Sequence, residues 1–370
     1  MLLHGCHYQD HMRINMKINY YSILDDLREY PDAWCYVAVS KRGPGKTYGC
    51  LKGALDQKKR IVYMKRTMDD VDLICSQGSE TDFSPYKPIN RDTNHNIKPV
   101  LIRTGIGGFY EMDEEDNPLG PPVAYTMALS AVRKYKGFDL SDADWIVFDE
   151  FVPQVGETRI NRKEGDQLLD FYMTVSRDRE QRGRDPLKLI MFANTVNVSS
   201  PVTNVLEITD DLAGMANKGI EYNYIPDRGI LLHWLPPDKY VQADPEKNSI
   251  YKAMQNTAWG RMAFSGDFAY NDFTAVKTMS LKGCKPMIHL HYKTHDYYIY
   301  LRQSDGLYYM CRSKSDKCLF SYDLNRENGQ KLFYLEHQID LRNETINDKM
   351  IFEQYSMYDL IVNYKQFFSL

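Results

Sequence analysis

A glycine-rich turn that ends in Lys46 and Thr47 is the stretch of this chain whose residue types most clearly predict chemistry. It reads SKRGPGKT and follows the phosphate-binding pattern G-x-x-x-x-G-K-[ST], with Ser40 in place of the first glycine. Gly43 and Gly45 can turn successive backbone amides toward one anion, and the following helix adds its positive end. Lys46 would neutralise the β- and γ-phosphates of ATP, and Thr47 would bind Mg2+. The predicted nucleotide-binding residues are Ser40, Lys41, Arg42, Gly43, Pro44, Gly45, Lys46 and Thr47.

Two adjacent acids supply the second half of this chemistry. Residues 144–151, DWIVFDEF, predict a buried strand whose carboxyl end carries Asp149 and Glu150. Asp149 would hold Mg2+ through water, and Glu150 would orient or deprotonate the water that attacks the γ-phosphate. A strand that ends in two acids is common by itself, but it gains weight from the phosphate loop upstream.

The neighbouring segments predict the elements that would position these groups. An apolar run before the loop and TYGCLKGAL after it predict the strand and helix that a phosphate loop requires, whereas the alternative is a basic surface turn. Residues 60–66, RIVYMKR, predict a second parallel strand that ends in two basic residues. Residues 98–112 predict a hairpin, because no helix start follows the glycines of TGIGGF.

Downstream, a helical stretch leads into a third buried strand, KLIMFANTV, and residues 229–237 would complete the sheet. Asn194 and Thr195, at the end of KLIMFANTV, occupy the place where many ATPases carry a polar residue that senses the γ-phosphate. Four arginines follow the helix, and a solvated helix end is the favoured interpretation for any single one of them. They are Arg177, Arg179, Arg182 and Arg184.

Composition and the remaining residues set the wider limits. The 370 residues suffice for two domains. Seven cysteines without a C-x-x-C pair indicate free thiols, no apolar stretch reaches membrane-spanning length, and the expected compartment is cytosolic. The net charge of −4 does not exclude a nucleic-acid partner. Weaker hypotheses are metal sites at His4, His7 and His11 or at His289, His291 and His295, and base stacking by Tyr21.

The ordered motifs SKRGPGKT, IVFDEF, TVSRDRE and FANTVNVSSP resemble those of the DNA-packaging ATPases of small short-tailed bacteriophages with protein-primed linear genomes, relatives of the terminase large subunit. The resemblance covers most of the chain, and IVFDEF with TVSRDRE is its specific part. It implies an α/β fold with an ASCE-type P-loop ATPase domain and mainly parallel sheet at 1–240. A helical linker at 241–275 and a smaller RNase H-like α+β domain at 276–370, a vestigial nuclease, would follow. A closing helix is expected at about 344–368.

Carried over residue by residue, the resemblance implies two roles at a subunit boundary. Arg177 matches an arginine finger offered to the neighbouring subunit's nucleotide, with Arg179 as the nearest alternative, and Lys136 matches a second basic position. Arg42 matches an arginine that the family keeps inside the loop. The phosphate, metal and catalytic roles fall on Lys46, Thr47, Asp149 and Glu150.

The expected function is an ATP-hydrolysing ring motor that moves double-stranded viral DNA into a preformed procapsid. The resemblance implies a homo-oligomeric ring, a pentamer, at the portal vertex in the cytoplasm of the infected bacterium, without a membrane partner. Some relatives also use a structural RNA. The strand MIHLHYK carries no acid, so nuclease activity is not expected. The alternatives are a P-loop helicase or other nucleic-acid-dependent ATPase, and a binding module without catalysis, against which Glu150 argues.

Overall fold

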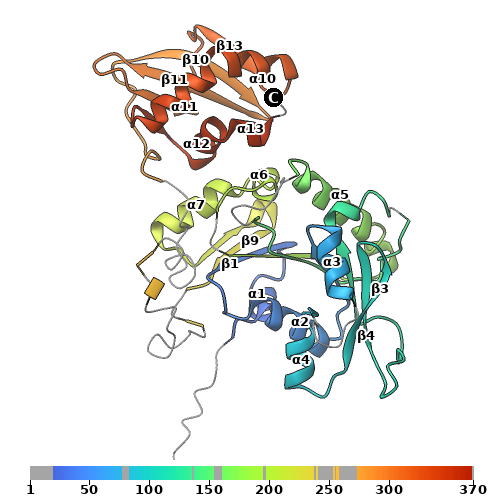
Figure 1. Ribbon diagram of the computed structural model, residues 1–370. Coiled ribbons are helices and arrows are strands. Elements are labelled where there is room, and N and C mark those ends of the chain that lie inside the picture. The colour runs from blue at the N-terminus through green and yellow to red at the C-terminus, as the bar shows by residue number, and fades with distance from the viewer. Residues whose placement is uncertain are drawn as a thin grey trace, which may run out of the picture.

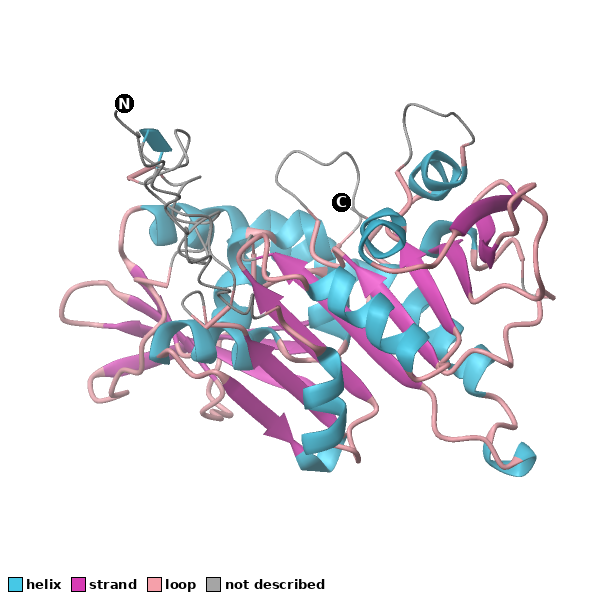
Figure 2. Ribbon diagram, turned by 90° about the horizontal axis from the view of Figure 1, so that it is seen from below, coloured by secondary structure: helices cyan, strands magenta, loops and turns pink. Residues whose placement is uncertain are grey.

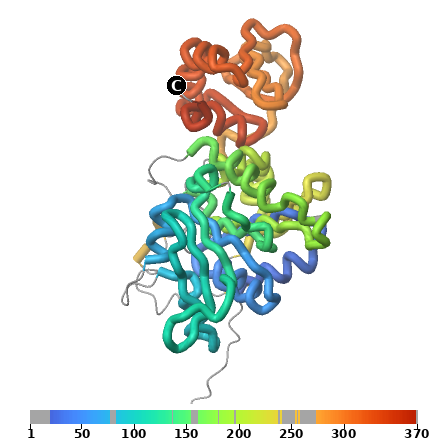
Figure 3. The backbone as a smooth tube through the Cα atoms, turned by 90° about the vertical axis from the view of Figure 1, so that its right-hand side faces the viewer, coloured from blue at the N-terminus to red at the C-terminus, as the bar shows by residue number. Residues whose placement is uncertain are grey.

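The computed structural model describes residues 20–76, 83–135, 137–153, 161–194, 197–236, 239–240, 253–254, 256–257 and 273–368. Within these residues the strands form two sheets, one of nine strands and one of five. Figure 1 shows the five-stranded unit, which holds the C-terminal end of the chain, beyond helices α6 (Pro201–Val205) and α7 (Thr209–Lys218) of the larger unit. Figure 3 shows the same separation from the side.

The larger sheet has the strand order β3-β4-β5-β2-β6-β7-β1-β9-β8. Its six central strands, from β5 to β9 in this order, pair in parallel, and antiparallel strands extend both edges. The bounds are β1 Cys35–Ser40, β2 Ile61–Lys65, β3 Ile97–Arg103, β4 Ile106–Glu111, β5 Ala124–Ala128, β6 Trp145–Asp149, β7 Lys188–Asn194, β8 Tyr222–Ile225 and β9 Ile230–Trp234. The mixed α/β fold and the strands expected at residues 60–66, 144–151 and 188–196 are confirmed.

The sequence of β1 explains its central position, because an apolar run can be buried on both faces of a parallel sheet. All six residues of CYVAVS are buried. Val37 and Val39 face the core beneath α5 (Glu164–Ser176), α6 and α7. Tyr36 and Ala38 face the opposite core, beneath α1 (Ile23–Glu29), α2 (Lys46–Asp56), α3 (Met68–Cys75) and α4 (Lys87–Asp92). Figure 2 shows helices running along the strands of the sheet.

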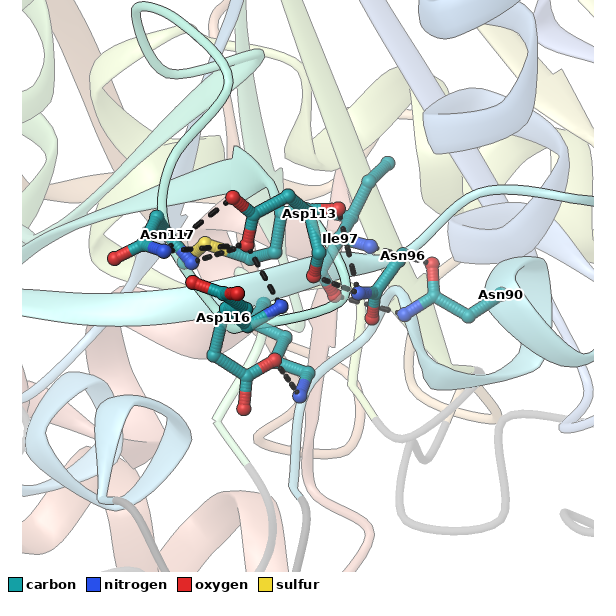
Figure 4. A network of polar contacts seen from close by, with 9 residues as sticks. Asn90, Asn96, Ile97, Asp113, Asp116 and Asn117 are labelled. Carbon is teal, nitrogen blue, oxygen red and sulfur yellow. Dashed lines mark hydrogen bonds and ion pairs between the residues drawn. The ribbon is translucent and has the colours of Figure 1, made fainter.

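The hairpin expected at residues 98–112 is formed by β3 and β4, and polar side chains secure its base. The Asn90 amide bonds both backbone groups of Ile97, at 2.8 and 3.0 Å, which ties α4 to β3 (Figure 4). The Asp113 carboxylate accepts bonds from the backbone amides of Glu115 and Asn117, at 2.9 and 2.8 Å. The acidic residues after β4 therefore shape a turn.

The smaller sheet has the order β13-β10-β11-β12-β14 and forms its own core with the C-terminal helices. Its strands are β10 Cys284–Tyr292, β11 His295–Arg302, β12 Tyr308–Cys311, β13 Phe320–Asp323 and β14 Met350–Phe352. Its helices are α10 Glu327–Phe333, α11 Ile339–Ile346, α12 Tyr355–Val362 and α13 Tyr364–Phe367, with a π-helical turn, η5 (Tyr334–Gln338), between α10 and α11.

The single closing helix expected at 344–368 is wrong. Helix α11 ends at Ile346, and Asp348 adopts a left-handed backbone with φ of 59°. The chain then returns to the sheet as β14, parallel to β12, before α12 and α13. The local apolar pattern did not reveal this strand because three residues are too few to set a period. Of the expected linker at 241–275, the structure describes residues 253–254, 256–257 and 273–275.

Polar contacts join the two units between α7 and α12. Asp210 of α7 accepts bonds from the Ser356 backbone amide and hydroxyl, at 2.8 and 2.7 Å, at the N-terminus of α12. The Ser199 hydroxyl donates to Asp359, at 2.5 Å, and Asp359 is buried. Burial raises the pKa of this carboxyl. The Asp210 carboxylate lies at the N-terminus of α12, where the helix dipole favours a negative charge. The junction between the two units is therefore a specific contact.

Candidate nucleotide site

The turn between β1 and α2 has the backbone that the sequence predicted. Gly43 and Gly45 have φ angles of 96° and 87°, in the left-handed region that favours glycine. Gly45 is the N-cap residue of α2. The positive N-terminal end of α2 therefore faces the turn, which suits an anion.

Ser40, which replaces the first glycine of the pattern, needs no glycine-like backbone. It is the last residue of β1 and is not among the described residues with positive φ. Its buried hydroxyl donates to the Lys41 carbonyl, at 2.6 Å, and accepts from Lys46 Nζ, at 2.5 Å. The serine thus holds the lysine of the loop.

Lys46 is a buried cation whose contacts are neutral oxygens. The residue is 8% exposed, and Nζ also lies 3.4 Å from the Lys41 carbonyl and 3.4 Å from Asn194 Oδ1. Burial lowers the pKa of Lys46 to about 8, partly opposed by the charges of Asp149 and Glu150. A buried cation of lowered pKa gains most from a bound anion.

The acid pair lies at the same edge of the sheet. β7 pairs with both β1 and β6, so one strand separates the turn from the acids. The Thr47 hydroxyl donates to Asp149 Oδ2, at 3.0 Å. Glu150 follows with a left-handed φ of 58° and a side chain that is 49% exposed. Hydroxyl and carboxylate oxygens are donors that suit Mg2+, so Thr47 and Asp149 could hold that ion.

These groups line one cavity of about 330 Å³. Its walls come from three segments that are distant in sequence: the glycine-rich turn, the end of β6 and the end of β7. The lining residues are Arg42, Gly43, Pro44, Gly45, Lys46, Thr47, Tyr48, Asp149, Glu150, Phe192, Ala193 and Asn194. The cavity therefore combines backbone amides that suit an anion, a buried cation, a hydroxyl–carboxylate pair that suits Mg2+ and an exposed carboxylate.

Sequence reasoning missed three residues at the end of β2 that hold the acid pair. The Tyr63 hydroxyl donates to Asp149 Oδ2, at 2.8 Å. Lys65 Nζ lies 3.6 Å from Asp149 Oδ2 and 3.4 Å from Glu150 Oε2. Arg66 donates to the Glu150 and Phe151 carbonyls, at 3.2 and 2.8 Å, and thereby secures the strained backbone at Glu150. The two basic residues that end RIVYMKR were the available signal.

Comparison with known proteins identifies the family. Residues 120–350 match the family model described as Podovirus DNA encapsidation protein (Gp16). The chain belongs to this family. The match includes Asp149, Glu150 and Arg177, while the glycine-rich turn precedes it. The resemblance to phage DNA-packaging ATPases is confirmed.

Solved structures share the fold of this Gp16-family chain. One is the bacteriophage phi-29 viral genome packaging motor assembly, at 16% identity and a TM-score of 0.62, covering 95% of this chain and 100% of that one. Another is the phi-28 gp11 DNA packaging motor, at 16% identity and a TM-score of 0.59, covering 95% and 98%. No curated protein matches the chain significantly.

The two arginines considered for the subunit boundary differ in this Gp16-family structure. Arg179 is 2% exposed; it donates to the Asp185 carbonyl, at 2.9 Å, and bonds the Ala143 carbonyl. Arg177 is exposed and does not line the nucleotide cavity. It lines another cavity of about 1010 Å³, between α5 and the segment after β5. The Arg179 guanidinium thus forms its hydrogen bonds within its own chain, whereas the Arg177 side chain is accessible to solvent.

The other residues expected at the site lie outside the described residues or away from the cavity. Lys136 and Thr195 lie outside the described residues, as do His4, His7 and His11. Tyr21 is buried and donates to Asp26, at 2.7 Å, so it packs in the core and does not face the cavity.

The histidines of the smaller sheet do not converge on one point. His289 Nε2 and His291 Nδ1 lie 2.8 and 2.9 Å from Asp296 Oδ1, and their hydrogen bonds lower the pKa of that carboxyl. His295 instead lies 3.4 Å from Glu207. Among the residues that the structure describes, no group of three or more His, Cys, Asp or Glu could hold a metal ion. None of the described helices is long and apolar enough to cross a membrane.

Proposed function

We propose that this chain is an ATP-hydrolysing motor subunit that moves double-stranded viral DNA into a preformed procapsid. The observation that carries the proposal is the convergence of Lys46, Thr47, Asp149 and Glu150 on one cavity, with Thr47 bonded to Asp149 at 3.0 Å. In a Gp16-family protein, this set has the composition needed to bind and hydrolyse a nucleoside triphosphate.

The roles follow from the chemistry of each group. The amides of the turn and Lys46 bind the phosphates, and Ser40 positions Lys46 through its hydroxyl. Bound Mg2+ would neutralise phosphate charge, with Thr47 and Asp149 as its protein ligands. Glu150 accepts the proton of the attacking water, and Lys65 and Arg66 orient it. Asn194, 3.4 Å from Lys46 Nζ, and Thr195 beyond it sense the γ-phosphate.

We interpret the larger unit as an ASCE-type P-loop domain. The position of β7 between β1 and β6 supports this assignment, because the additional strand separates the phosphate loop from the acids. The division into an ATPase domain at 1–240, a linker at 241–275 and a C-terminal domain at 276–370 is part of the same proposal.

The smaller unit is proposed to be RNase H-like but without nuclease activity. In support, its first three strands form an antiparallel meander, and β13 pairs in parallel with the first of them. The exposed face of β10 carries His289 and His291, and Asp296, the carboxylate beside them, is shared by both histidines. Two-metal cleavage needs clustered acids. We assign this unit to attachment of the motor to its DNA or procapsid.

We further propose that Arg177 acts on the nucleotide of a neighbouring subunit, with Lys136 as a second basic group there. Arg179, two residues away, contacts Ala143, which precedes β6, whereas the acid pair lies at the carboxyl end of β6. Arg177 therefore lies toward the amino ends of the parallel strands, whereas the nucleotide cavity of its own chain lies at their carboxyl ends. In a ring of subunits, pentameric as the resemblance implies, Arg177 would reach the nucleotide of the next subunit. The ring would lie at the portal vertex in the host cytoplasm, with or without a structural RNA.

The test of the activity is an ATPase assay on the full chain, alone and with duplex DNA, single-stranded DNA or empty procapsids. Stimulation by duplex DNA and procapsids together supports packaging, whereas stimulation by single strands alone would favour a helicase. Glu150→Gln should retain ATP binding and lose about 10²–10⁴-fold in turnover, while Lys46→Ala should lose binding. Near-normal hydrolysis by Glu150→Gln contradicts its assignment.

The trans role is tested by mixing inactive subunits. Arg177→Ala subunits keep their own Lys46 and Glu150, and Glu150→Gln subunits keep Arg177, so mixed assemblies should regain hydrolysis that neither variant shows alone. An arginine finger contributes about 10³–10⁵-fold in turnover. Arg182→Ala, at another exposed arginine after α5, is the matched control and should hydrolyse normally. Normal hydrolysis by assembled Arg177→Ala would refute the assignment.

A further inference from the structure

Two tyrosine rings lie beside the glycine-rich turn and have no part in the proposed hydrolysis. Tyr48 directly follows Thr47 and lines the same cavity as Lys46 and Asp149. The Tyr20 ring lies next to it, with 5.9 Å between ring centroids and 46° between ring planes. Tyr20 is 45% exposed. At this exposure the Tyr20 ring is not part of the core.

The chain holds the Tyr20 ring against the turn. The Tyr21 backbone amide donates to the Pro44 carbonyl, at 2.9 Å, which joins this segment to the glycine-rich turn. A Cβ atom added to Gly45 would lie 2.8 Å from a ring carbon of Tyr20. The ring therefore packs directly on the backbone that would bind phosphate, and Gly45 is required for this close approach as well as for its positive φ.

Tyr48 lies close to Asp92, at the end of α4. Burial and the negative charge of Asp92 raise the pKa of Tyr48. Because Tyr48 also lines the cavity, its ring can offer a face to a ligand there.

Tyr21, the residue after Tyr20, differs because it packs in the core. Tyr21 is 1% exposed, and its ring contacts Phe192 and Tyr240 edge to face. When the phosphates of a nucleoside triphosphate are bound at Lys46, its base must lie near the turn. Exposed aromatic faces at this place provide favourable stacking with any base. We infer that Tyr20 and Tyr48 form a platform on which the base of the bound nucleoside triphosphate stacks. The inference rests on the proposed nucleotide site and adds how the base is recognised.

The test separates the base from the phosphates. Calorimetry on the full chain with Mg2+ would measure the affinities for ATP and for inorganic tripolyphosphate, in wild type, Tyr20→Leu, Tyr48→Leu and the double variant. Tyr110→Leu, on β4, is the matched control, because four strands lie between β4 and β1. The double variant should bind ATP roughly 5- to 150-fold more weakly, the effect of losing a base–aromatic stack. Its tripolyphosphate affinity should stay within about twofold of wild type, because the stack contributes nothing to phosphate binding.

Each outcome decides between distinct explanations. Unchanged ATP affinity in the double variant, or an equal loss for ATP and tripolyphosphate, overturns the platform, since the rings would then be idle or only support the turn. If wild type bound neither ligand, the proposed nucleotide site itself would fail. A measurement without substitution guards against misfolded variants: the fluorescence of 2-aminopurine riboside triphosphate should be quenched when its base stacks in wild type. Binding without quenching also overturns the platform.

Discussion

The lowered pKa of Lys46 makes the affinity for nucleotide depend on pH between 7 and 9. In the free chain, burial holds this pKa at about 8. A bound polyphosphate stabilises the charged ammonium, so the pKa must be higher in the complex. Between the two values the complex holds more protons than the free chain, and affinity falls as pH rises through this window.

The magnitude follows from the free-state value. With a pKa of about 8, the lysine is about 90% protonated at pH 7 and about 10% protonated at pH 9. If the complex stays protonated, ATP binding should be about tenfold weaker at pH 9 than at pH 7. Binding should also take up about half a proton at pH 8 and about 0.9 proton at pH 9. Calorimetry in buffers of different ionisation enthalpy measures both quantities.

Lys46→Arg is the control, because an arginine stays charged throughout this range. Its affinity for ATP can be lower than that of wild type, but it should not change between pH 7 and 9. Wild-type affinity that stays constant over this range would refute the argument. The same pH slope in Lys46→Arg would refute it equally, because another group would then be responsible.

Three further outcomes are expected. Tyr63→Phe removes one hydrogen bond to Asp149 without changing bulk, so the Mg2+ concentration for half-maximal hydrolysis should rise about 10- to 100-fold; an unchanged requirement would show that Thr47 suffices. Arg179→Ala should lower the free energy of unfolding by roughly 1.5–3 kcal/mol in urea denaturation, because its guanidinium bonds buried carbonyls, whereas Arg177→Ala should leave it within about 0.5 kcal/mol; the reverse order would contradict their burial. Incubation of the full chain with duplex DNA and Mn2+ should leave the DNA intact, and cleavage that EDTA abolishes would show an active nuclease.

Local sequence was sufficient wherever the necessary information lay within a few residues. The turn needed Gly43 and Gly45 because their φ angles are positive, and the apolar runs of β1, β6 and β7 could be buried only as central strands. The order of turn, acids and arginine-rich segment identified the family. These features depend on backbone conformation and local hydrophobicity, both of which are encoded residue by residue.

Only the tertiary structure decided which side chains meet. Tyr63, Lys65 and Arg66 reach the acid pair because β2 lies beside β6, a pairing between residues more than 80 positions apart in the chain. Exposure separated Arg177 from Arg179, and Tyr20 from Tyr21, although each pair has neighbouring positions and similar chemistry. The segment expected to be one closing helix contains a strand and two helices, because β14 pairs with β12 at the edge of the smaller sheet. Long-range pairing and burial depend on the whole chain, so no local pattern could have determined them.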